Sequence, residues 1–271
     1  MELPDYHGGS IVNLMASLQV GLGGREHGYR SLRHLSPDTV ADHRQIILWV
    51  IDGLGYEYLR AHPQATHLNA AVQGRITSVY PPTTASAITT FLTGDAPQQH
   101  GLTGWYVYFR ELGSVITVLP GHTRFGGTAY AGGGVDVAGL LNHTPFSERI
   151  EVESYNLSPS YIVDSPFNLA HLGKAKGVGY KSLEDLCAKT LEIAGRPGRR
   201  YLYLYWPELD TIGHQHGIWS KQAEQHLLEL DKAFQLLSER LKGSDALLIV
   251  CADHGQVLSL IHISEPTRPL H

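Results

Sequence analysis

Three apolar runs rich in β-branched and aromatic residues do most to limit the folds open to this chain. They are IILWVI at residues 46–51, RYLYLYW at 200–206 and ALLIVCA at 246–252. Continuous apolar runs of this length are typical of strands buried on both faces of a parallel sheet. Each run is followed by an acidic residue, and these are Asp52, Asp210 and Asp253. The runs predict an α/β fold with a mostly parallel central sheet.

The segment between the last two runs, residues 221–243, has the spacing of an amphipathic helix. Its apolar positions recur at steps of three and four: Ala223, Leu227, Leu230, Phe234, Leu237 and Leu241. Such a stripe packs on a sheet, and Gly243 is placed to end the helix. A strand, a helix and a strand in this order predict a right-handed βαβ unit.

The chain has 271 residues, which is enough for one large domain. We expect this domain to span residues 1–257. Residues 104–175 are rich in Gly, Tyr and Pro and have poor periodicity, so we interpret them as an insertion or lid over one edge of the sheet. The last residues, 258–271, resemble a translated sequencing adapter, so we expect a non-native tail and a domain that is incomplete at its C-terminal end.

Composition excludes several functional classes. The formal charge is −5, from 21 basic and 26 acidic residues, with no long basic run, which argues against nucleic-acid binding. No apolar run approaches the roughly 20 residues needed to span a membrane, and the N-terminus lacks the pattern of a signal peptide. Cys187 and Cys251 form no CxxC motif, which fits a reducing compartment. We therefore expect a cytoplasmic protein.

The three strand-end aspartates predict a metal site. The carboxyl ends of parallel strands meet at one edge of a sheet, where Asp52, Asp210 and Asp253 would repel one another without a cation. His254 follows Asp253 directly, and His214 lies four residues after Asp210, on the same face if this stretch is helical. Mixed carboxylate and imidazole ligands suit Zn²⁺ or Mn²⁺ better than Mg²⁺. Any one of these aspartates alone is explained as a helix cap or turn residue.

A candidate nucleophile lies in VYPPTTASAITTFLTG at residues 79–94. Pro82 favours extended backbone before it, so Thr83 or Thr84 occupies the start of a helix. The alternative role for Thr84 is that of a helix cap alone. A helix N-terminus also attracts phosphate, and a metal ion lowers the pKa of a bound hydroxyl. A threonine hydroxyl beside the metal ligands would form a site for phosphoryl transfer.

Four segments in order resemble the alkaline phosphatase superfamily, and within it the type I phosphodiesterase/nucleotide pyrophosphatase family. They are LWVIDGLG at 48–55, YPPTTASAITTFLTGDAPQQHGLTG at 80–104, YWPELDTIGHQHG at 205–217 and CADHGQV at 251–257. Each is moderately specific alone, and the resemblance covers residues 45–257. It implies a three-layer αβα, alkaline phosphatase-like fold with two bound zinc ions and a small phosphoester substrate.

The resemblance also implies roles for single residues. Thr84 matches the nucleophile, with Thr83 as the competing position if the alignment shifts by one. The ligands of the metal beside the nucleophile match Asp52, Thr84, Asp253 and His254. Asp210 and His214 match two of the three ligands of the second metal, and the third ligand of the family has no counterpart before residue 258. His262 and His271 are not taken as substitutes.

One departure bears on the substrate. In the family that this chain resembles, nucleotide pyrophosphatases typically carry an asparagine three residues after the nucleophile, where it helps hold the phosphoryl group, and this chain has Ala87 there. The resemblance therefore argues against efficient nucleotide hydrolysis and for another phosphodiester or a phosphonate-like compound as the substrate. The resemblance predicts a metal-dependent hydrolase of phosphodiester or pyrophosphate bonds. The alternatives are another member of the superfamily (a phosphomonoesterase, a phosphonoacetate hydrolase or a phosphomutase) and an inactive truncated fragment.

Overall fold

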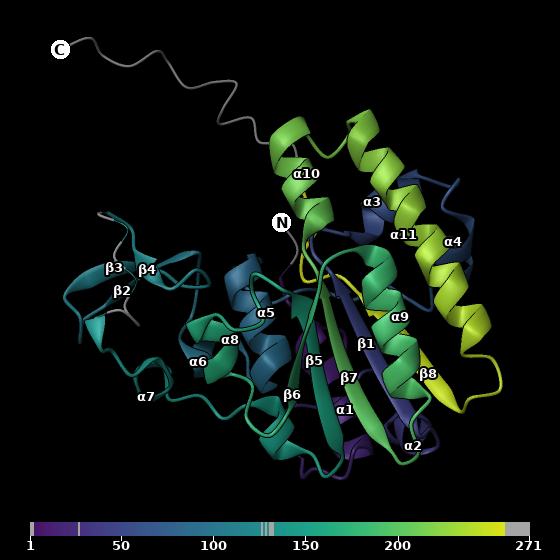
Figure 1. Cartoon of the computed structure of the whole chain (residues 1–271), viewed down its shortest axis with the longest axis horizontal. Coiled ribbons are helices and arrows are strands. Elements are labelled where there is room, and N and C mark those ends of the chain that lie inside the picture. Colours follow the sequence, from purple (N-terminus) through teal and green to yellow (C-terminus); the bar gives the residue numbers. More distant parts are fainter. Residues whose placement is uncertain (1–2, 27, 126, 128, 130–132, 258–271) are drawn as a thin grey trace.

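The computed structural model describes residues 3–26, 28–125, 127, 129 and 133–257, and the expected tail at 258–271 lies outside them. A parallel sheet of five strands in the order β6-β5-β7-β1-β8 forms the centre of this part of the chain (Figure 1). The strands are β1 (Gln45–Ile51), β5 (Glu153–Pro159), β6 (Lys176–Tyr180), β7 (Arg200–Trp206) and β8 (Ala246–Cys251). The α/β class and the parallel sheet are confirmed.

Strand β1 explains why the sheet is covered on both faces. All seven of its residues are buried. Because successive side chains of a strand point to opposite faces, Ile46 and Leu48 join one hydrophobic cluster while Ile47 and Trp49 join the other. Helices must therefore pack on both sides, which makes the three layers that the sequence predicted.

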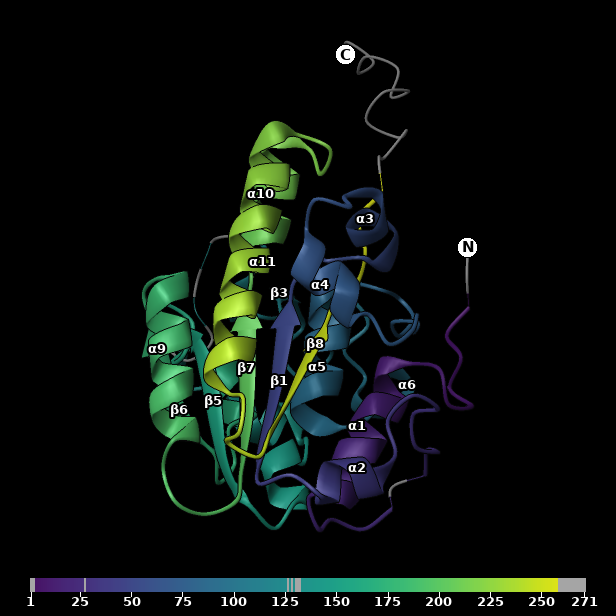
Figure 2. The same cartoon turned by 90° about the vertical axis from the view of Figure 1, so that its right-hand side faces the viewer.

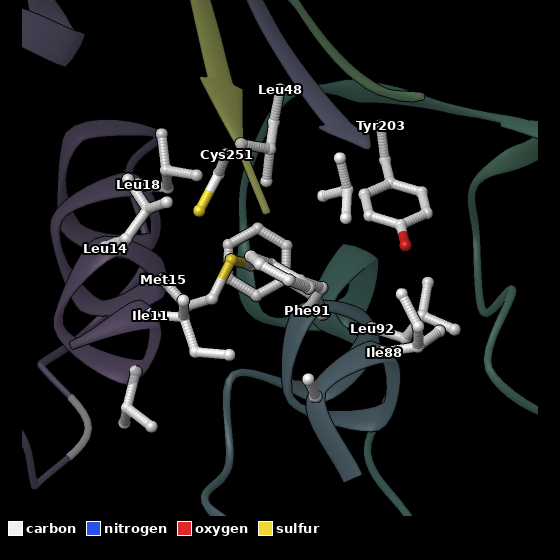
Figure 3. Close-up of a cluster of buried hydrophobic side chains, with 14 of the residues drawn as sticks. Ile11, Leu14, Met15, Leu18, Leu48, Ile88, Phe91, Leu92, Tyr203 and Cys251 are labelled. Atoms are coloured by element: carbon white, nitrogen blue, oxygen red, sulfur yellow. The ribbon is translucent and has the colours of Figure 1, made fainter. Parts of the chain in front are cut away.

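The two outer layers consist of different helices (Figure 2). One face carries α1 (Ile11–Gly21), α2 (Pro37–Ala41) and α5 (Thr84–Thr93), and the other carries α3 (Tyr56–Ala61), α4 (Thr66–Ala71), α9 (Leu183–Ala194) and α11 (Lys221–Arg240). Figure 3 shows how Met15 of α1 meets Phe91 of α5 beneath β1 and β8. This packing holds the first turn of α5 at the carboxyl edge of the sheet.

The predicted amphipathic helix is α11, and its apolar stripe packs on the sheet. It ends at Arg240, and Gly243 lies in the turn beyond it with a φ of +78°, a conformation that glycine adopts freely. The strands on either side of this helix, β7 and β8, are parallel but not adjacent, because β1 lies between them.

The segment 104–175, expected to be an insertion, is only partly separate from the core. Residues 153–159 form β5, a central strand, so the expected boundaries include part of the main sheet. Outside that sheet lie a small antiparallel sheet of β2 (Tyr106–Phe109), β3 (Ser114–Thr117) and β4 (His122–Thr123), and α7 (Val137–Leu141) (Figure 1). The sequence of β5, ESYNLSP, lacks a continuous apolar run, so the sequence pattern did not predict this strand.

The remaining short elements connect these layers: α6 (Pro97–His100), the 3₁₀ helix η2 (Phe146–Arg149), α8 (Pro166–Ala170) and α10 (Glu208–His216). Of the helices that the structure describes, none combines the length and apolar character needed to cross a membrane.

Strand β8 is an edge strand in the described part of the chain and pairs with β1. Residues 246–250 are all apolar yet only half-buried. A hollow of about 340 Å³ follows this edge, lined by apolar side chains such as Leu14 of α1, Leu68 of α4 and Phe234 of α11. The inner strands of the sheet are thus buried, whereas its edge at β8 is apolar and only half-buried.

Truncation of a core side chain in β7 tests the two-sided burial of the sheet. Leu204 has no exposed surface, so we expect Leu204→Ala to lower the free energy of unfolding by about 2–5 kcal/mol, measured by urea denaturation. Leu236→Ala on α11, where the side chain is 43% exposed, is the control and should change it by less than about 0.5 kcal/mol. Equal losses in the two variants would contradict the described burial.

Candidate active site

Two strand ends bring together a pair of buried carboxylates. Asp52 directly follows β1, and Asp253 lies two residues beyond β8. Asp52 is 2% exposed and Asp253 is fully buried. Each of Asp52, Asp253 and His254 offers one ligand atom within 4.8 Å of the other two. The adjacent pairing of β1 and β8 is the physical reason, because it places the ends of both strands side by side.

Hydrogen bonds satisfy one oxygen of each carboxylate and leave the other without a partner. Asp253 Oδ1 accepts from the backbone N–H groups of Gly53 (3.0 Å) and His254 (2.8 Å). Asp52 Oδ2 accepts from the Tyr205 hydroxyl at 2.6 Å. Asp52 Oδ1 and Asp253 Oδ2 are buried and have no hydrogen-bond partner among the described residues. Unpaired buried carboxylate oxygens are costly, and a divalent cation is the group that would satisfy both.

The His254 ring has the orientation and tautomer of a metal ligand. Its Nδ1 lies 3.1 Å from the carbonyl oxygen of Gly255, which can only accept, so Nδ1 is assigned the proton. The lone pair of Nε2 then points to the cluster, 3.4 Å from Asp52 Oδ1 and 3.5 Å from Asp253 Oδ2. These three side chains fit a divalent cation with carboxylate and imidazole ligands.

Burial raises the pKa of both carboxyl groups in the absence of a cation. For Asp52, desolvation is the main cause, and the nearby charge of Asp253 adds to it. For Asp253, desolvation raises the pKa to about 7 against the opposing hydrogen bonds of its backbone donors. A bound cation would reverse both shifts because it favours the ionised form.

The structure distinguishes the two candidate threonines. Thr83 is the N-cap of α5, and its Oγ1 lies 3.2 Å from the Ser86 hydroxyl. Thr84 is the first helical residue, and its Oγ1 lies 3.0 Å from His254 Nε2. Only Thr84 of the two lines the cavity described below and contacts the candidate metal ligands.

Asp210 and His214 lie together near this cluster but are not part of it. Both are on α10, and the predicted spacing of four places Asp210 Oδ2 3.3 Å from His214 Nε2. The His214 side chain is 81% exposed. Asp210 Oδ1 accepts a hydrogen bond of 2.7 Å from Gln256 Nε2. The described residues thus place one carboxylate and one imidazole side by side on α10, next to the cluster of Asp52, Asp253 and His254.

A cavity of about 430 Å³ opens beside these groups. Asp52, Thr84 and Asp210 line its polar end. Its other walls are largely apolar and aromatic, and they comprise Trp105, Leu119, Pro120, Tyr161, Ile162, Phe167 and Tyr203, among others. No Lys or Arg of the described chain contributes to the lining. The cavity can therefore accept an organic group next to a phosphoryl group at Thr84.

Ala87 is not among the residues that line this cavity. It is fully buried and packs in the hydrophobic cluster formed with α1. Thr84, three residues before it, and Ile88, the residue after it, line the cavity instead. The methyl group of Ala87 therefore packs in the core, and the expectation drawn from the missing asparagine stays a prediction.

Tyr205 and Gln256 are polar partners of the site that sequence reasoning missed. Tyr205 belongs to an alternating series with Tyr201 and Tyr203, which places it on one face of β7. Gln256 directly follows the motif residues Asp253–Gly255. Neither position is informative until the register between β7 and β1, about 150 residues apart in sequence, is known.

The structure thus places candidate metal ligands and a hydroxyl together at the carboxyl edge of an α/β sheet, the edge where parallel sheets bind their ligands. The family model for type I phosphodiesterase/nucleotide pyrophosphatase matches residues 46–264. The chain belongs to this family, as the four motifs predicted. No curated protein sequence matches the chain.

Solved structures of longer proteins share the fold. Two structures of murine ectonucleotide pyrophosphatase/phosphodiesterase 5 match with a TM-score of 0.58 and 20% identity, over 78% of this chain and 57% of theirs. One of the two is described as an inactive threonine-to-alanine variant in complex with AMP. The human protein matches with a TM-score of 0.57 and 19% identity, over 78% of this chain and 56% of its own. The chain thus spans just over half the length of these proteins.

The buried carboxylates predict a specific pH dependence for the metal-free chain. Since folding raises the pKa of Asp253, the folded state holds more protons than the unfolded state between about pH 4 and 7. The contribution of Asp253 to the free energy of unfolding should therefore decrease over this range, by at most about 1.4 kcal/mol per pH unit. We expect the free energy of unfolding of the parent chain minus that of Asp253→Asn, measured by urea denaturation in EDTA, to decrease as the pH rises over this range.

The comparison with Asp253→Asn is needed because buried histidines act in the opposite direction. Burial lowers the pKa of His100 to about 3 and that of His171 to about 4, so their contributions favour folding as the pH rises. These contributions are shared by both proteins and cancel in the difference. A difference that grows with pH in EDTA would contradict the raised pKa of Asp253.

Saturating Zn²⁺ or Mn²⁺ should stabilise the parent by about 3 kcal/mol at a hundredfold excess over the dissociation constant.

Proposed function

We propose that this chain is a metal-dependent hydrolase of phosphodiester or pyrophosphate bonds, with Thr84 as its nucleophile. One observation carries the proposal: the Thr84 hydroxyl lies 3.0 Å from His254 Nε2, beside two buried carboxylate oxygens that have no partner among the described residues. Membership of the family supports the reaction class. The neighbouring murine protein supports the role of a threonine, because its alanine variant is described as inactive.

The metal ions would be held by side chains already in place. Asp52, Asp253 and His254 would bind one cation together with the Thr84 oxygen, and Asp210 with His214 would bind a second. The mixed oxygen and nitrogen ligands favour Zn²⁺, with Mn²⁺ as the alternative. Bound divalent cations lower the pKa of a coordinated hydroxyl and neutralise charge on phosphoryl oxygens.

The chain's own groups then account for the steps of the reaction. The Thr84 oxygen attacks phosphorus, a new P–O bond forms, and the bond to the leaving oxygen breaks in line with it. The proton of the Thr84 hydroxyl is lost to solvent, and the leaving group departs with the electron pair of the broken P–O bond and takes up a proton from solvent. The backbone N–H groups in the first turn of α5, which have no partner within the helix, would favour the negative charge of the transferred group. Water then attacks phosphorus of the phosphothreonine, the bond between phosphorus and the Thr84 oxygen breaks, and the phosphate product leaves as the Thr84 oxygen regains a proton.

The cavity supports a substrate that carries an organic group on phosphorus. Trp105, Tyr161 and Phe167 offer flat apolar surface beside the polar end of the cavity. The absence of Lys and Arg from the described lining disfavours a second dianionic group there. The AMP bound in the murine neighbour supports a nucleotide or a similar planar ester as the substrate.

Replacement of the nucleophile tests the proposal directly. We expect Thr84→Ala to reduce hydrolysis of bis-p-nitrophenyl phosphate at least about a thousandfold, because the hydroxyl makes the new bond to phosphorus. Metal content measured by elemental analysis should stay near that of the parent, since three protein ligands remain. Thr83→Ala is the matched control and should keep activity within about threefold. Full activity of the Thr84→Ala protein would refute the proposed nucleophile.

A comparison of two substrates tests the diester assignment. We expect kcat/KM for bis-p-nitrophenyl phosphate to exceed that for p-nitrophenyl phosphate at least about tenfold, because the apolar cavity binds the second ester group. Trp105→Ala should reduce this ratio, whereas Trp219→Ala, at an exposed indole that does not line the cavity, should not. A higher rate on the monoester would identify a phosphomonoesterase instead.

A further inference from the structure

Three tyrosines of β7 offer a natural comparison of buried hydroxyl groups. Tyr201, Tyr203 and Tyr205 alternate along the strand and pack in the same hydrophobic cluster. All three side chains are buried. Within the described residues, the hydroxyls of Tyr201 and Tyr203 are buried without a hydrogen-bond partner. The Tyr205 hydroxyl alone among the three donates to a carboxylate, Asp52 Oδ2, at 2.6 Å.

The sheet register makes this contact a rigid one. Tyr205 pairs with Val50 on β1, and Trp206 pairs with Ile51. Asp52, the first residue after β1, donates its backbone N–H to the Trp206 carbonyl oxygen at 2.9 Å. The end of β7 therefore holds both the backbone and the side chain of Asp52. Both partners of Asp52 belong to a buried strand, so little conformational freedom has to be lost when a cation binds.

The hydrogen bond decides which oxygen of Asp52 is free. Because Tyr205 occupies Oδ2, Oδ1 faces His254 Nε2 at 3.4 Å and has no partner in the described chain. A phenol hydroxyl is protonated at neutral pH, so Tyr205 is the donor in this hydrogen bond and Asp52 Oδ2 the acceptor. Without that donor, Oδ2 would be buried and unsatisfied, and the carboxylate could rotate about its χ2 angle.

We propose that Tyr205 is a positioning residue that fixes Asp52 as a single-oxygen ligand, through Oδ1, of the cation beside Thr84. The inference rests on the proposed function in one respect only, that a divalent cation occupies the cluster of Asp52, Asp253 and His254. It needs no assumption about the substrate. Partners that orient a metal ligand typically change metal affinity by 10–100-fold when they are removed.

Cobalt titration measures this effect without any substrate. Co²⁺ replaces Zn²⁺ in carboxylate and histidine sites, and its visible absorption reports the coordination geometry. We expect Tyr205→Phe to weaken Co²⁺ binding by about 10–100-fold and to change the visible band. Tyr203→Phe removes a hydroxyl from the same strand, the same face and the same cluster, and it should bind Co²⁺ within about twofold of the parent and with an unchanged band.

A second variant covers the case in which Tyr205→Phe fails to fold, which circular dichroism would reveal. Incorporation of 3,5-difluorotyrosine at position 205 keeps the ring and its packing but makes the hydroxyl more acidic. It should shift the Co²⁺ band at neutral pH, and the same replacement at position 203 should not. Equal effects of the matched changes at 203 and 205 on affinity and band would overturn the inference, as would a parent chain that binds no Co²⁺.

Failure of this inference and failure of the proposed function give different results. A parent chain that binds Co²⁺ and shows the Tyr205 effect, yet hydrolyses no phosphoester, would support the positioning role and refute the hydrolase. A parent chain that hydrolyses diesters while Tyr205→Phe binds Co²⁺ normally would refute the positioning role alone. Hydrolysis by Tyr205→Phe adds a check. We expect kcat to fall by a larger factor than KM rises, and we expect excess metal to restore part of the lost kcat.

Discussion

The proximity of two buried carboxylates at the carboxyl edge of the sheet is the constraint on which the rest of this structure depends. Asp52 and Asp253 come from strands that are 200 residues apart in sequence but adjacent in space. Nothing in the described chain neutralises them apart from His254 and hydrogen-bond donors. A bound cation would explain why both carboxylates are buried, because the interior of a protein disfavours unpaired negative charges. The position of α5 follows the same logic, since it delivers a hydroxyl and a positive helix end to that point.

The sequence predicted those parts of the fold that a continuous apolar run encodes, and it failed elsewhere. Strands β1, β7 and β8 were foreseen because each consists of a nearly continuous apolar run, which is typical of strands in a parallel sheet. Strand β5 was not, since ESYNLSP buries polar side chains that are paired in the structure, as Asn156 is with Asn168 of α8. Such burial depends on partners from other segments, so local pattern cannot reveal it.

The site was predictable to the extent that strand ends converge. The clustering of Asp52, Asp253 and His254 and the pairing of Asp210 with His214 followed from position and spacing. The contact between Tyr205 and Asp52 required the register of two distant strands. The sequence did not show which residues of α5 face the cavity, because the rotation of this helix about its axis is set by packing on α1 and β1.

The open margin of β8 affects how this chain behaves in concentrated solution. Among the described residues β8 pairs only with β1, and its apolar sequence contains none of the lysines and prolines that commonly protect edge strands. An edge strand of this kind is a template for pairing with a second molecule. A lysine placed within β8 would hinder such sheet-to-sheet growth.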